Sequence, residues 1–233
     1  MLLLGLFVGF GLAILLEYLV EITSRKLPFL SKSPACPACN ENMGMSSKLP
    51  VIGYALTLGR CPHCGQKQSL TLTLMELLLI SFSVWSFTTL EISMAFQMSL
   101  LCMGLLGVTV VDLKKWIIPN YFVLVILIVS LIPIISGVGN LVNALSGLGV
   151  AAIVSLFLVI PQRLGSGDKT LAWGDVKLCL VAGLWLGWVL AIYVFFVASL
   201  LASLFWIIAG VFKGFSIQRR LQFGPFVALS TML

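Results

Sequence analysis

The longest apolar run of the chain extends from Val176 to Phe212, and Lys177 is its only charged residue. As a single helix, this run would measure about 55 Å, whereas the hydrocarbon core of a bilayer is about 30 Å thick. We therefore predict two membrane spans, 176–190 and 191–212, because Gly187 and its neighbours offer a turn at a membrane interface. A run of this kind restricts the chain to folds in which helices cross a membrane.

The composition of the whole chain agrees with a membrane protein. Apolar residues make up 60% of the sequence and charged residues 9%, and the mean hydropathy is +1.13; in soluble proteins about a quarter of the residues are charged. Charged residues, glycines and prolines separate the apolar runs, and a span requires about 20 residues. We predict an all-α polytopic membrane protein with about eight transmembrane helices. The segments are 2–20, 71–90, 93–111, 118–136, 141–161, 176–190, 191–212 and 222–233, the last being shorter than a full span.

The 14 lysines and arginines indicate how the chain is oriented. Thirteen of them fall in alternate connections between the segments, and Lys177 stands at the edge of one such connection, at the start of a span. The positive-inside rule therefore places those connections in the cytoplasm and the N-terminus outside. We divide the chain into a first transmembrane helix at 1–22, a cytoplasmic domain at 23–70 and a transmembrane domain at 71–233. The net charge of +6 follows from this topology. Because no basic stretch alternates with aromatic residues, we expect no nucleic-acid partner.

Two Cys-x-x-Cys pairs lie in the cytoplasmic domain, Cys36 with Cys39 and Cys61 with Cys64. Their spacing is typical of four-cysteine zinc sites. A domain of this size has little core of its own, so we predict that the four thiolates bind one structural zinc ion. Two disulfides and a redox pair are the alternatives, and a reducing cytoplasm argues against the disulfides. His63, the only histidine, is predicted to be a neighbour of this site.

Two aspartates stand at the ends of apolar runs. Asp112 ends one run and Asp175 begins another, so the predicted topology brings both to the cytoplasmic level. Because the chain lacks Gly-x-Ser-x-Gly and His-Glu-x-x-His motifs, serine and zinc hydrolase chemistry has no base. Two close carboxyls share a proton, so one activates a water and the other polarises a carbonyl. We predict Asp112 and Asp175 as the catalytic pair, and Gly174 and Lys177 as substrate-binding residues, the glycine admitting a substrate backbone.

With these residues in view, the chain resembles the type IV prepilin peptidases, membrane aspartic proteases of the Gly-x-Gly-Asp group. The matching blocks are the cysteine pairs, Asp112 with Ile118-Pro119-Asn120, Gly174 to Leu178, and Phe223 to Phe226. The resemblance implies removal of the short basic leader from type IV prepilins or type II secretion pseudopilins, after a glycine, at the cytoplasmic face of the bacterial inner membrane. It also implies a periplasmic N-terminus and assigns catalysis to Asp112 and Asp175.

The chain departs from the family pattern at several positions. Ala172 replaces the first glycine of Gly-x-Gly-Asp, and a literal match ends upstream at Asp168. We retain Asp175, because it enters a span, whereas Asp168 lies in a polar loop where a solvated turn residue is expected. Many family members also methylate the new N-terminus with S-adenosylmethionine. Glu21 stands where the family has an asparagine late in the first span, and Leu-Thr-Leu around Leu72 replaces the family's Arg-Tyr-Pro before the second span. These two departures leave that second activity open.

Two other classes of function are compatible with parts of the sequence. A membrane transporter also places carboxylates at membrane depth, but it should show internal repeats, which we do not find. A non-catalytic zinc-stapled membrane scaffold would have no need of two aspartates at one level. The expected partners are prepilin or pseudopilin substrate helices and the lipid bilayer, and the sequence does not determine the oligomeric state.

Overall fold

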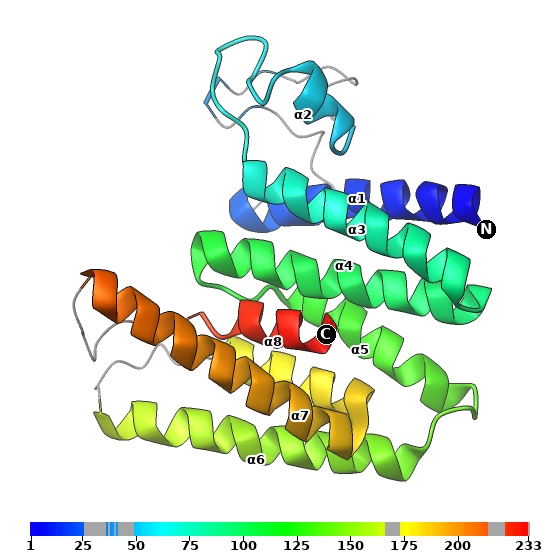
Figure 1. Cartoon of the computed structure of the whole chain (residues 1–233), viewed down its shortest axis with the longest axis vertical. Coiled ribbons are helices and arrows are strands. Elements are labelled where there is room, and N and C mark those ends of the chain that lie inside the picture. The colour runs from blue at the N-terminus through cyan, green and yellow to red at the C-terminus, as the bar shows by residue number, and fades with distance from the viewer. Residues whose placement is uncertain are drawn as a thin grey trace. The chain divides into compact units, whose positions relative to one another are not determined.

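The computed structural model describes residues 1–25, 36, 38–39, 41, 49–165, 173–213 and 222–232. Over these residues the chain forms eight α-helices and no strand (Figure 1). They are α1 (Leu2–Arg25), α2 (Ile52–Leu56), α3 (Leu70–Thr89), α4 (Ile92–Lys115), α5 (Asn120–Ile135), α6 (Leu141–Gly165), α7 (Trp173–Lys213) and α8 (Gly224–Met232). The predicted all-α fold is confirmed, since each predicted transmembrane segment contains a helix and α2 lies in the polar domain.

Four helices of the described chain are long and apolar enough to cross a membrane, judged by length and composition. They are α1 over Leu2–Thr23, α3, α4, and α7 over Trp173–Phe212. Two more helices, α5 and α6 over Leu141–Phe157, are apolar but shorter. In a bilayer only helices and closed barrels satisfy every backbone polar group internally, so apolar runs of this length form helices.

Helix α7 is interrupted at Gly187, where φ is 71° and ψ is 177°. In Figure 1 the helix reverses its direction between its yellow and orange portions. The backbone is in the region that favours glycine, and a Cβ at Gly187 would collide with the side chain of Asn143 on α6. The length argument thus placed the break between the two predicted spans correctly, although the boundary lies a few residues before the predicted one.

The chain divides into two compact units, Met1–Val111 and Asp112–Leu233. In the first unit α1 packs on α3, where a Cβ at Gly9 would lie 3.0 Å from the Cα of Ile80. In the second unit α7 packs on α5, α6 and α8. A Cβ at Gly183 would lie 2.6 Å from the Cβ of Ala151, so small residues let α6 and α7 approach closely, as is common between membrane helices. The three-part domain division made from the sequence stays a prediction.

Helix α5 shows how the sequence fills the core of the second unit. Phe122, Ile126 and Val129 share one face by their helical spacing and are almost fully buried. Leu124 and Ile128, on other faces of the same helix, are 53% and 52% exposed. A helix that is apolar on all sides is typical of a membrane-embedded protein.

Candidate active site

Asp112 lies in the last turn of α4, and its side chain is 5% exposed. The helix ends at Lys115. The next residue, Trp116, has a φ of 59° and donates its backbone N–H to the carbonyl oxygen of Asp112 at 2.9 Å. This is a helix ending with a left-handed residue, a position usually taken by glycine. A large side chain there costs of order 1–3 kcal/mol, and such strain tends to occur at functional sites.

The carboxyl group of Asp112 is poorly satisfied for a buried group. Its Oδ2 has no hydrogen-bond partner among the residues that the structure describes. Leaving a buried acceptor unpaired costs about 1–3 kcal/mol, so an atom of this kind in a folded protein calls for a functional explanation. This unpaired oxygen points to a functional role for Asp112 and not to a structural one.

Asp175 lies in the first turn of α7, where a carboxylate interacts favourably with the helix dipole. Its side chain is half-buried. The carboxyl group interacts electrostatically with that of Asp112 and lies near the backbone N–H of Gly224, at the start of α8. The second unit therefore brings together the two predicted catalytic aspartates, which are far apart in the sequence, and places the beginning of α8 beside them.

Gly174 packs against the segment that joins α4 to α5. A Cβ at this position would lie 2.8 Å from the Cβ of Ile118 and 3.1 Å from its Cγ1. Atoms do not approach that closely in folded proteins, so the structure gives an intramolecular reason for a glycine beside Asp175. The predicted role of Gly174 in admitting a substrate backbone stays a prediction.

Lys177 joins the beginnings of two helices. Its Nζ donates a hydrogen bond of 3.3 Å to Oδ1 of Asn120, the first residue of α5, while the side chain remains exposed. Its predicted role in substrate binding is not decided by this contact. Asp168 and Ala172, which distinguish the two possible readings of the Gly-x-Gly-Asp motif, lie outside the described residues.

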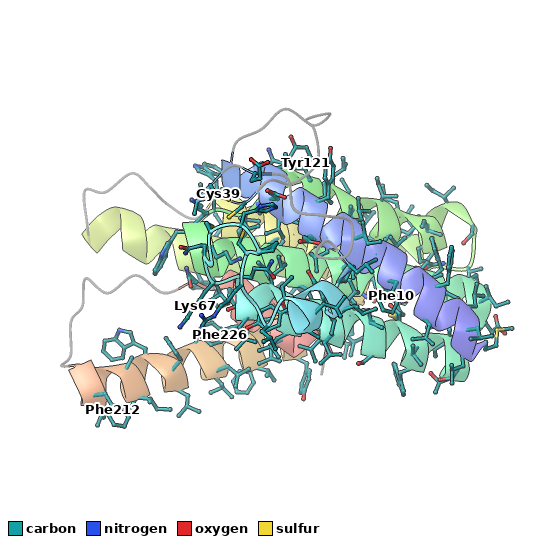
Figure 2. The ribbon with its side chains drawn as sticks, turned by 90° about the horizontal axis from the view of Figure 1, so that it is seen from above. Phe10, Cys39, Lys67, Tyr121, Phe212 and Phe226 are labelled. Atoms are coloured by element: carbon teal, nitrogen blue, oxygen red, sulfur yellow. The ribbon has the colours of Figure 1, made fainter. Side chains whose placement is uncertain are left out.

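Four cysteines form a cluster that can hold a metal ion. The Sγ atoms of Cys36, Cys39, Cys61 and Cys64 all lie within 4.8 Å of one another; Figure 2 shows yellow sulfur at Cys39. The Sγ atoms of Cys36 and Cys64 are 3.6 Å apart, and those of Cys39 and Cys61 are 4.0 Å apart. A tetrahedral ion with metal–sulfur bonds of about 2.3 Å requires sulfur atoms about 3.8 Å apart. A disulfide requires about 2.05 Å, and all four residues are free thiols.

The ionisation of these thiols also favours a cation. Backbone N–H groups of Cys39 and Ala38 donate to the Cys36 sulfur and lower its pKa to about 6. The pKa of Cys64 rises to about 12: the Gln66 backbone N–H lowers it, but burial and the three neighbouring thiols raise it by more. Four thiolates this close repel one another, and a bound dication removes that repulsion.

The second cysteine pair is held by a tight turn. The backbone N–H of Gly65, whose φ is 72°, donates to the carbonyl of Cys61, and the N–H of Cys61 donates to Gln66, both at 2.9 Å. Gly59, with a φ of 66°, lies beneath the ring of Tyr54, which leaves no room for a Cβ. The glycines are therefore required by backbone conformation in both places.

Glu76 connects the cysteine-containing domain to α3. Its side chain is 4% exposed, and Oε2 accepts a hydrogen bond of 3.1 Å from the backbone N–H of Val51. Val51 precedes α2 and has a φ of 59°, which is unfavourable for a β-branched residue. The sequence gives no sign of this anchoring contact, because Val51 and Glu76 lie 25 residues apart.

Sequence reasoning also missed Gln222. Its Nε2 donates a hydrogen bond of 2.6 Å to the backbone carbonyl of Asp112. The family block at Phe223–Phe226 drew attention to this part of the chain, but a glutamine in front of a helix carries no signal of its own.

Two family models match this chain. The type IV leader peptidase family matches residues 99–207, and the bacterial peptidase A24 N-terminal domain matches residues 3–90. The first match includes both Asp112 and Asp175, and the second includes the four-cysteine cluster. Together with the apolar helices, these matches define a multi-pass inner-membrane protease.

Relatives support the same assignment, and each is named prepilin leader peptidase/N-methyltransferase. That of Dickeya chrysanthemi is 30% identical over 207 residues, which cover 84% of this chain and 70% of the relative. That of Aeromonas salmonicida is 28% identical over 197 residues, which cover 84% of this chain and 68% of the relative. That of Vibrio cholerae is 26% identical over 212 residues, which cover 87% of this chain and 80% of the relative. No solved structure matches the chain. The chain belongs to the type IV leader peptidase family, which confirms the resemblance and the protease activity predicted from the sequence.

Proposed function

We propose that this protease removes the short basic leader from type IV prepilins or type II secretion pseudopilins, with Asp112 and Asp175 as its catalytic pair. The observation that carries the proposal is the electrostatic interaction between the two carboxyl groups, which lie at the end of α4 and the start of α7. The names of the relatives support the substrate class. The distribution of basic residues supports cleavage at the cytoplasmic face.

The pair supplies acid and base to the same peptide bond. Two neighbouring carboxyls share one proton, so one is ionised while the other is protonated. The ionised group removes a proton from a water, whose oxygen adds to the scissile carbonyl, and the protonated group donates a hydrogen bond to that carbonyl oxygen. Collapse of the tetrahedral intermediate breaks the carbon–nitrogen bond, and the leaving amine takes a proton from the pair. We make no separate assignment of acid and base, because the pair titrates as a unit.

The substrate is an apolar helix that lies in the bilayer with its basic leader in the cytoplasm. Attack requires an extended peptide at the junction, because an amide within a helix is shielded. A glycine before the scissile bond weakens a helix by roughly 1 kcal/mol relative to alanine. Cleavage should therefore slow when that glycine is replaced by a stronger helix former.

The four-cysteine cluster is proposed to bind one zinc ion. The tetrahedral separations of its sulfur atoms fit zinc, and a closed four-thiolate site has a structural role, since no position is left for a substrate. The ion would hold the first and second cysteine pairs together in a domain with little core of its own. Peptide hydrolysis then depends on the aspartates and not on the metal.

Methylation of the new N-terminus is a second candidate activity, because the relatives are named N-methyltransferases as well. The methyl donor would be S-adenosylmethionine. Mass spectrometry of the cleaved product, with and without this donor, tests the proposal. A gain of one methyl group at the new N-terminus is expected, and an unmodified product in the presence of active protease would argue against it.

The test of the protease assignment is a cleavage assay in reconstituted membranes with a prepilin-type substrate. Asp112→Asn and Asp175→Asn should lower the rate by about 100-fold or more, as expected for loss of a general acid or base. Asp168→Asn is the matched control and should retain most activity. If Asp168→Asn is as inactive as Asp175→Asn while both variants insert normally, the catalytic assignment is wrong. If the wild-type protein cleaves no such substrate, the proposed substrate class is wrong.

A further inference from the structure

The residue in front of α8 contacts the residue that bears one of the proposed catalytic carboxyls. Nε2 of Gln222 donates to the backbone carbonyl of Asp112 at 2.6 Å, although 110 residues separate them in the sequence. Gln222 is half-buried, so the bond is partly shielded from water. A short, partly desolvated hydrogen bond between distant segments restrains both of them.

The accepting carbonyl belongs to the last turn of α4. It also accepts the backbone N–H of Trp116 at 2.9 Å, and Trp116 holds the left-handed conformation that terminates the helix. A backbone carbonyl has two lone pairs, so these two donors satisfy it fully. The last carbonyls of a helix otherwise depend on water, and the last turn tends to fray. Gln222 therefore restrains the turn from which the Asp112 carboxyl projects.

Helix α8 holds Gln222 in place. The ring of Phe226, labelled in Figure 2, packs against Phe205 of α7 with ring centroids 5.8 Å apart and an interplanar angle of 54°. Gly224 is buried, and its backbone N–H lies near the Asp175 carboxyl. Three consecutive residues, Gln222 to Gly224, thus reach both aspartates from one anchored segment.

We propose that Gln222 is a positioning residue for catalysis: it fixes the last turn of α4 through the Asp112 carbonyl, so that the two carboxyls keep their productive separation. The inference rests on the proposed function. Gln222 does not touch the substrate and acts only through Asp112. Its loss should therefore lower kcat and leave KM almost unchanged, because binding of the substrate helix does not depend on it.

The experiment compares two substitutions of Gln222 in the full-length protein in reconstituted membranes. Gln222→Met keeps the length and volume of the side chain but removes the donor, and kcat should fall at least about fivefold, the rate equivalent of one hydrogen bond. If the turn shifts by 1 Å, the loss would approach about 100-fold. Gln222→Lys restores an N–H donor of similar reach and should recover much of kcat.

Gln97→Met is the matched control. Gln97 is also half-buried, and it lies on α4 roughly four turns before Asp112, away from the aspartate pair. It should cleave at the wild-type rate. A wild-type kcat in Gln222→Met, or a loss that Gln222→Lys does not reverse, would overturn the positioning role. A change confined to KM would also overturn the positioning role. These failures differ from failure of the proposed function, in which the wild-type protein itself would not cleave the substrate.

Discussion

A glycine beside the second aspartate can be tested through its packing partner. A Cβ at Gly174 would lie 2.8 Å from the Cβ of Ile118, whereas ordinary contact begins at 3.4 Å. The start of α7 or the α4–α5 connection must therefore move by about 0.6 Å in Gly174→Ala, and overpacking of this kind costs about 1–3 kcal/mol. Since a 1 Å misplacement of a catalytic group costs about 100-fold in rate, we expect kcat to fall about tenfold.

The assay is leader cleavage in reconstituted membranes, combined with thermal unfolding. Gly149→Ala is the matched control, because Gly149 lies on α6 with no atom within 4 Å of the added Cβ. Alanine is the better helix former by about 1 kcal/mol, so this control should be at least as stable as the wild type. It should also cleave normally.

A second substitution separates packing from substrate approach. The three atoms that an added Cβ at Gly174 would meet first all belong to the Ile118 side chain, so Ile118→Gly removes the collision. The double variant Gly174→Ala/Ile118→Gly should regain activity relative to Gly174→Ala. Full activity in Gly174→Ala alone would refute the close-packing argument. No recovery in the double variant would show that the glycine serves another purpose, and the approach of a substrate backbone would then be the better explanation.

Three further predictions concern the four-cysteine cluster, the hydrogen bond of Glu76 that anchors the cysteine-containing domain, and the contact between α6 and α7. The purified protein should contain about one zinc ion per chain, and Cys61→Ser should lose most of it, as measured by elemental analysis; a metal-free wild type would contradict this. Glu76→Leu should destabilise the first unit by about 1–3 kcal/mol, because the Val51 N–H loses its acceptor, and unchanged protease sensitivity of the cysteine domain would argue against the anchor. Gly183→Leu should lower the melting temperature, because a Cβ already meets Ala151 at 2.6 Å, and an unchanged value would show that α6 and α7 can separate without cost.

Local sequence patterns predicted the helices and the clustering of the four cysteines well. Apolar runs must become helices in a bilayer whatever their neighbours are, and the limited thickness of the bilayer required a break near Gly187, where φ is 71°. The Cys-x-x-Cys spacing places two thiols on one turn. The tertiary structure therefore only had to bring two such turns together. The separations of 3.6 and 4.0 Å between sulfur atoms agree with that expectation.

The sequence by itself determined the class of fold, the two cysteine pairs that form one cluster, and which carboxyls stand at the ends of apolar runs, since each follows from short-range pattern and from the bilayer. Only the tertiary structure decided that Gln222 meets the Asp112 carbonyl and that Ile118 fills the space over Gly174. These partners lie far apart in the chain. Their contact depends on how the helices pack, and a side chain's type and neighbours in sequence do not specify which distant backbone group it will reach.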